Sequence, residues 1–128
     1  MSRNIEVDTK QKELNHISDV LLHTFLNTTA IRNNNIEPML LYDDFIQTMN
    51  RINCDNPSYI PSIDILISVA FNDFSGKLLQ YLLEHGGWCH INKREKDSGF
   101  SLIYCCVTLG NWRNLEVLFS EAKKRDII

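Results

Sequence analysis

The stretch SGFSLIYCCVTLGNWRNLEVLF, residues 98–119, decides the fold of this chain. It contains two apolar runs that are separated only by Gly110 and Asn111. Glycine ends a helix because it adopts the left-handed conformation without steric cost, and asparagine caps the first turn of a helix that follows. Ser101 is placed to cap the first run in the same way. We therefore expect two antiparallel helices joined by a tight turn at Gly110 and Asn111.

A similar pair of runs occurs earlier, in SIDILISVAFNDFSGKLLQYLLEHGG, residues 62–87. Ser62 and Ser75 are placed to cap its two helices, and Gly86 to end the second. A period of roughly 20 to 50 residues is typical of stacked repeat units. An offset of 36 residues aligns apolar positions of the two stretches with each other: Ile67 with Ile103, Ala70 with Cys106, Phe71 with Val107, Leu79 with Leu115, Leu82 with Leu118, and Leu83 with Phe119.

Two further helices are expected before residue 61. Asp8 is placed to cap a helix over residues 8–26, and a second helix begins near Pro38, because proline is tolerated in a first helical turn. The polar segment 32–35 separates these helices, and residues 53–61, which contain two prolines, form a connection. The helical spacing of apolar residues predicts that the following side chains face inward: Leu14, Ile17, Val20, Leu21, Leu22, Phe25, Leu41, Phe45, Thr48 or Met49, and Ile52.

Residues 62 to about 122 resemble ankyrin repeats, in which a capped helix with two small residues is followed by a glycine turn and a leucine-rich helix. The resemblance implies an all-α fold of stacked antiparallel helix pairs and a role in protein recognition without catalysis. The residues that carry it are Gly99, Ser101, Ile103, Cys106, Val107, Gly110, Asn111, Leu115, Leu118 and Phe119, and in the earlier unit Ile67, Ala70, Leu79, Leu82, Leu83, residues 84–87 and Asn92.

The chain also departs from the ankyrin pattern. Tyr104 stands where the motif has histidine, Leu102 where it has proline, and Phe74 at the turn glycine of the earlier unit. The period of 36 residues is longer than that of a typical ankyrin repeat, and the additional residues fit in the charged loop at residues 92–99. We expect a single domain over residues 1–128, in which residues 62–97 and 98–128 form the two ankyrin-like units and residues 1–61 form a divergent third repeat or an N-terminal helical cap.

Composition excludes several functional classes. The net charge of −3 provides no basic surface for nucleic acid, and no apolar run is long enough to cross a membrane. The N-terminus has no apolar core of a secretion signal, and the four cysteines show no disulfide spacing. We therefore expect an intracellular protein, located in the cytoplasm or the nucleus, that needs no cofactor. The high content of asparagine and isoleucine is compatible with a viral or pathogen protein that modulates host signalling.

Catalysis and metal binding have little support in the sequence. Cys105 or Cys106 with His85 or His90 would pair a nucleophile with a base, but a buried thiol without cationic neighbours is inert. Cys89 and His90 with the adjacent cysteines lack the spacing of a structural zinc site. We expect neither an enzyme nor a metal protein.

The resemblance implies where a protein partner binds. Ankyrin-type proteins use the variable positions of the inner helices and the finger-like loop between units, and Trp112 is an additional exposed anchor at a variable position. The predicted partner-binding residues are Val69, Asn72, Asp73, Lys93, Arg94, Glu95, Lys96, Asp97, Cys105, Thr108, Leu109 and Trp112.

Two other interpretations remain open. The segment HGGW at residues 85–88 resembles an element of Bcl-2-like proteins, which bind an amphipathic BH3 helix in a groove. An uncapped apolar end would instead favour a self-associating structural protein, such as a homodimer.

Overall fold

The computed structural model describes residues 2–28, 38–73 and 75–127, with side chains from 9–27, 42–73 and 75–127. These residues form six α-helices: α1 (Ser2–Thr28), α2 (Pro38–Asp55), α3 (Ile63–Asn72), α4 (Lys77–Glu84), α5 (Leu102–Leu109) and α6 (Trp112–Lys124). A short 3₁₀ helix, η1 (Gly87–His90), follows α4. The described residues contain no β-strand, so the expected all-α class is confirmed. The turn expected at residues 32–35 and the position of Phe74 lie outside the described residues.

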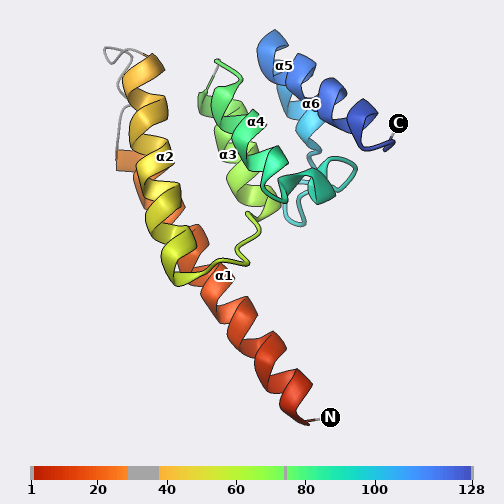
Figure 1. Ribbon diagram of the computed structural model, residues 1–128. Coiled ribbons are helices and arrows are strands. Elements are labelled where there is room, and N and C mark those ends of the chain that lie inside the picture. The colour runs from red at the N-terminus through yellow and green to blue at the C-terminus, as the bar shows by residue number, and fades with distance from the viewer. Residues whose placement is uncertain (1, 29–37, 74, 128) are drawn as a thin grey trace.

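The helices lie in two rows that run across the molecule (Figure 1). In one row α3 contacts both α1 and α5, and in the other α4 contacts both α2 and α6. Consecutive helices also pack together across the rows, because α1 contacts α2, α3 contacts α4, and α5 contacts α6. None of the helices in the described part of the chain combines the length and the apolar composition that a membrane crossing requires.

One apolar core runs through both rows. Residues that are 36 positions apart in the sequence are both buried in several cases, such as Leu66 and Leu102, or Leu82 and Leu118. Not every aligned apolar position is buried, because Phe71, Val107 and Phe119 are exposed. The other fully buried side chains include Phe45, Met49, Ile65, Val69, Ala70, Leu78, Leu79, Leu83, Ile91, Cys105 and Cys106.

Most of the caps that the sequence predicts are present, but Ser75 is not the N-cap of α4, because that position is Gly76, which makes no side-chain hydrogen bond. Ser62 and Ser101 each accept a hydrogen bond from a backbone N–H in the first turn of α3 and α5. Asn111 caps α6 by accepting from the N–H of Asn114 at 3.2 Å. Gly110 ends α5 with a φ of 67°, the left-handed conformation that favours glycine. The tight turn between α5 and α6 is therefore confirmed at both of its residues.

Helix α1 differs from its prediction in two respects. It begins at Ser2, so Asp8 lies inside the helix and does not cap it. Its buried face carries Ser18, Leu22 and Leu26, while Leu14, Ile17, Val20 and Leu21 are exposed. The inward positions expected at Leu14, Ile17, Val20 and Leu21 were therefore wrong by a rotation of about one residue, whereas Leu22 is buried as expected. The positions expected in α2 at Phe45, Met49 and Ile52 are also buried. The side chain of Leu41 lies outside the described residues.

A polar network explains which face of α1 turns inward. The buried Asn56, which follows α2, donates from Nδ2 to Asn15 Oδ1 at 3.0 Å and to Ser18 Oγ at 3.1 Å, and it accepts from Gln11 Nε2 at 2.9 Å. A buried amide is costly unless it is hydrogen-bonded. The network therefore favours the face that carries these partners over the neighbouring apolar face.

Candidate protein-binding surface

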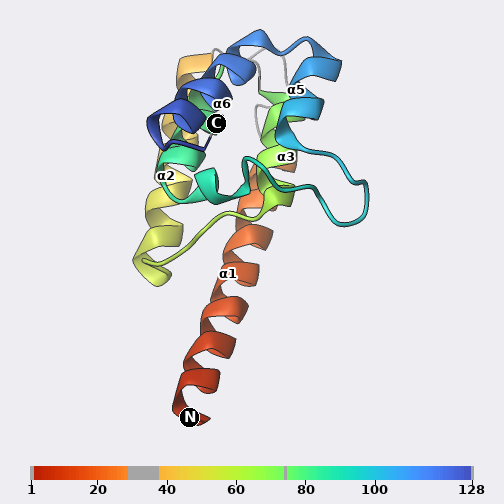
Figure 2. The same cartoon turned by 90° about the vertical axis from the view of Figure 1, so that its right-hand side faces the viewer.

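The finger loop, residues 92–99, is held in one conformation by hydrogen bonds. An antiparallel bridge pairs Arg94 with Ser101, and the Glu95 N–H donates to the Phe100 carbonyl at 2.7 Å. The Glu95 carboxylate accepts from the backbone N–H groups of Asp97 at 3.0 Å and Ser98 at 2.5 Å. These bonds order the tip of the loop, which projects away from the helices (Figure 2).

Glu95 and Asp64 have opposite electrostatic environments. Hydrogen bonds from Ser98 and Asp97 stabilise the carboxylate of Glu95 and lower its pKa. Burial raises the pKa of Asp64 at the start of α3, and the negative charge of Glu95 raises it further. The base of the finger loop is therefore acidic where it meets α3.

An aromatic pair lies where the finger loop meets α5. The rings of Phe100 and Tyr104 are tilted, with centroids 5.0 Å apart, and the Tyr104 side chain is 52% exposed. Both residues line a shallow hollow of about 250 Å³ together with Arg94 and Ser101. A half-exposed aromatic pair beside an arginine has the composition that protein interfaces favour.

The structure distributes the predicted binding residues over surface and interior. Lys93, Arg94, Lys96 and Asp97 are exposed on the finger loop, where Glu95 is half-buried. On the helices Asn72, Thr108 and Trp112 are exposed and Leu109 is half-buried. Val69, Asp73 and Cys105 are buried, so their assignment to a surface that contacts a partner is corrected.

Packing gives the reason for these three corrections. Val69 and Cys105 occupy equivalent positions of the contacting helices α3 and α5, and both side chains are enclosed in the shared core. The carboxylate of Asp73 instead accepts hydrogen bonds from the backbone N–H of Ser75 at 3.1 Å and of Leu78 at 3.4 Å, which satisfies the start of α4. These residues build the fold and do not present a binding surface.

Apart from Asn72 on α3, the predicted residues that are exposed or half-buried form two separate groups. The finger loop lies before the first residue of α5, whereas Thr108, Leu109 and Trp112 lie at its other end. An α-helix rises about 1.5 Å per residue, so the eight residues of α5 separate the groups by about 12 Å. The finger-loop group has the aromatic pair beside it.

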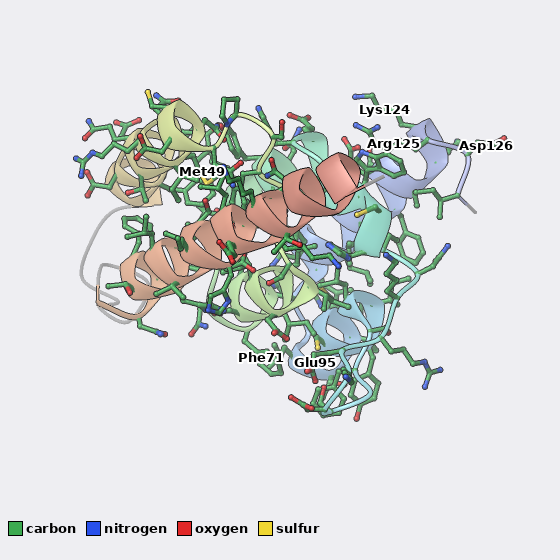
Figure 3. The ribbon with its side chains drawn as sticks, turned by 90° about the horizontal axis from the view of Figure 1, so that it is seen from below. Met49, Phe71, Glu95, Lys124, Arg125 and Asp126 are labelled. Carbon is green, nitrogen blue, oxygen red and sulfur yellow. The ribbon has the colours of Figure 1, made fainter. Side chains whose placement is uncertain are left out.

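Sequence reasoning missed Phe100, Tyr104 and Phe71 as surface residues. Tyr104 was noted only as a departure from the ankyrin motif, and Phe71 only as an apolar position aligned with Val107. Figure 3 shows Phe71 from α3 on the same side of the molecule as Glu95 from the finger loop. The spacing of Phe100 and Tyr104 by four residues was the available signal, because side chains separated in this way meet at the start of a helix.

Burial shifts the pKa values of the Cys105 and Cys106 thiols and of the half-buried His90 in the directions that favour their uncharged forms. Burial raises the pKa of Cys106 to about 11 and also raises that of Cys105, so both thiols stay protonated at neutral pH. His90 Nε2 donates to the carbonyl of Pro61 at 2.8 Å, and burial lowers the pKa of this histidine. Within the described residues, no three histidine, cysteine or acidic side chains are grouped to hold a metal ion.

Comparison with known proteins found no matching family model, no matching curated protein and no matching solved structure.

Proposed function

We propose that the chain is a non-enzymatic protein–protein interaction module built from ankyrin-like helix pairs. Three observations support the repeat arrangement: the alternating contacts of the two rows, the shared burial of positions 36 residues apart, and the repeated serine caps of α3 and α5. Residues 1–61 then supply the third pair, α1 and α2. Such a scaffold keeps its backbone nearly unchanged when it binds.

The recognition surface in this proposal is the finger loop together with the aromatic pair of Phe100 and Tyr104. The observation that carries the proposal is the position of these rings beside Arg94, at the base of a hydrogen-bonded loop. An ordered loop loses little conformational entropy on binding, so its contacts contribute more of their energy to affinity. The aromatic rings supply apolar contact area, and the charged tip selects among partners.

Affinity capture from a cell lysate tests this surface. The wild-type chain is compared with a variant that carries Arg94→Ala, Lys96→Ala and Tyr104→Ala, and with a control that carries Lys10→Ala and Lys12→Ala on the exposed face of α1. Circular dichroism shows whether all three chains remain folded. We expect the binding variant to lose a protein that the wild type and the control both retain.

Two results would contradict the proposal. If the binding variant retains every captured protein, the finger loop and Tyr104 are not the recognition surface. If a purified amphipathic BH3 helix binds equally to all three chains, the groove-binding alternative replaces the ankyrin-like one.

A further inference from the structure

Helix α6 carries an exposed face that no other part of the described chain covers. Trp112 is 66% exposed and Phe119 46% exposed, and Glu116 and Lys123 are exposed beside them. The spacings of four, three and four residues place all four side chains on one side of the helix. Figure 2 shows α6 on the side of the molecule that faces the viewer.

In α4, the residues that correspond to this face of α6 pack against other helices. Leu79 and Leu83 of α4 are fully buried in the core that α4 shares with α6. The residues 36 positions later are Leu115, which is only half-buried, and Phe119, which is exposed. α4 is thus covered by the next helix in its row, whereas α6 is the last helix of that row.

We propose that this face of α6 binds the same face of a second copy of the chain, across a two-fold axis that passes between Phe119 and Ser120. The two α6 helices then run antiparallel, and the two Phe119 rings meet beside the axis. This inference is independent of the finger-loop function proposed above, because it uses a different helix and a different partner.

Charge complementarity identifies a second copy as the occupant. In an antiparallel pair with this axis, two residues that lie at equal distances before and after the axis along α6 face each other across the two copies. Glu116 and Lys123 are such a pair, so Glu116 of one copy faces Lys123 of the other. Symmetry repeats the pair, which gives two ion pairs flanking the aromatic centre. Neither Glu116 nor Lys123 takes part in an ion pair within the described residues of one chain.

The apolar face of α1 provides no equivalent arrangement. Leu14, Ile17 and Leu21 are exposed there, but an antiparallel pairing of two α1 helices centred on Ile17 would place Lys10 opposite Thr24 and Glu13 opposite Leu21. It therefore brings no opposite charges together. This stripe is the competing surface in the test below.

The exposed area indicates a weak dimer. Trp112 and Phe119 together expose on the order of 250 Å² per chain, because a large aromatic side chain has about 200 Å² or somewhat more. With the polar residues around them, a symmetric contact buries about 1,000 Å² in total, near the lower limit for specific interfaces. We expect a dissociation constant in the micromolar range and weaker association at high salt.

Sedimentation equilibrium at several protein concentrations tests the pairing through charge reversal. Glu116→Lys and Lys123→Glu each replace two attractive pairs by two repulsive ones, so each is expected to weaken dimerisation by about tenfold or more. The double variant with Glu116→Lys and Lys123→Glu restores the pairs in reverse order and is expected to dimerise like the wild type.

Matched controls separate this effect from a general change in charge. Glu13→Lys and Lys12→Glu make the same charge changes on α1, and both are expected to leave the dimer unchanged. The proposal is overturned if the wild type stays monomeric up to the highest micromolar concentrations, or if the double variant does not regain the dimer that its single variants lose. It is also overturned if Ile17→Glu abolishes association while Phe119→Glu has no effect, because the contact then lies on α1.

Discussion

Replacing Asn111 by alanine should destabilise the fold more than any other single change in the turn between α5 and α6. The Asn111 side chain is buried, and its Nδ2 donates to the carbonyls of Ala70 and Asp73 at 3.0 Å each. Its Oδ1 accepts from the N–H of Asn114. One amide therefore caps α6 and also ties this helix to the end of α3.

The expected cost follows from these three bonds. Loss of the cap costs about 1 kcal/mol, and loss of the two buried bonds to carbonyls costs about 1 kcal/mol each. The carbonyl of Asp73 keeps a second donor, Asn114 Nδ2 at 2.7 Å, so the total should stay close to 3 kcal/mol. For a domain of this size that change lowers the melting temperature by about 10 °C.

Chemical denaturation followed by far-ultraviolet circular dichroism measures this cost. Asn72→Ala is the matched control, because the Asn72 side chain is exposed and its hydrogen bond among the described residues is a local one, to the carbonyl of Ser68 one turn earlier. The control should change stability by no more than about 0.5 kcal/mol. If Asn111→Ala costs no more than Asn72→Ala, the two long-range bonds do not hold α6 to α3 and the reasoning fails.

Three further substitutions probe the region after α4 and the turn after α5. The pKa of His90 is lowered from 6.5 by burial, so the folded state binds fewer protons than the unfolded state and stability should fall as pH drops below 6.5. His90→Gln keeps a donor for the carbonyl of Pro61 and should flatten that fall; an unchanged slope between pH 7 and pH 5 in denaturant titrations would contradict this. Gly87→Ala should cost several kcal/mol, because its Cβ would lie 2.7 Å from the carbonyl oxygen of Leu82. Gly110→Ala has open space and only an unfavourable φ, so it should cost roughly 1–2 kcal/mol, and equal costs in thermal melts would refute the steric argument.

The all-α class, the starts of α3, α5 and α6, and the end of α5 were predictable because they depend on local chemistry. Ser62, Ser101, Asn111 and Gly110 act on the backbone within a few residues of their own position. A cap or a left-handed glycine has the same effect in almost any tertiary context. These signals therefore carried over directly from sequence to structure.

The inward face of α1 was not predictable from periodicity, because the helix has two overlapping apolar faces. Leu14 and Leu21 form one and Leu22 and Leu26 the other, and they differ by about one residue of rotation. The choice between them depends on Asn56, which is distant in sequence and requires polar partners on α1.

The binding surface was predicted only in part for a similar reason. Asp73 was assigned as a variable position of an inner helix, yet it is buried and its carboxylate accepts hydrogen bonds from backbone N–H groups at the start of α4. Val69 and Cys105 were assigned by the register of the ankyrin motif, and the close contact of α3 with α5 encloses both side chains. Whether a side chain is exposed depends on the distance between neighbouring helices, and the repeat motif does not specify this distance.

The length of α1 changes how the molecule should move in solution. Its 27 residues span about 40 Å, and it extends well beyond the other helices (Figure 1). A compact chain of 128 residues has a radius of gyration of about 14 Å, so this helix gives the protein an elongated outline and increases its hydrodynamic drag. A monomer should therefore elute early from a gel-filtration column, at the volume of a larger globular protein. Elution volume alone would then imitate a dimer, whereas light scattering, which reports mass independently of shape, would not.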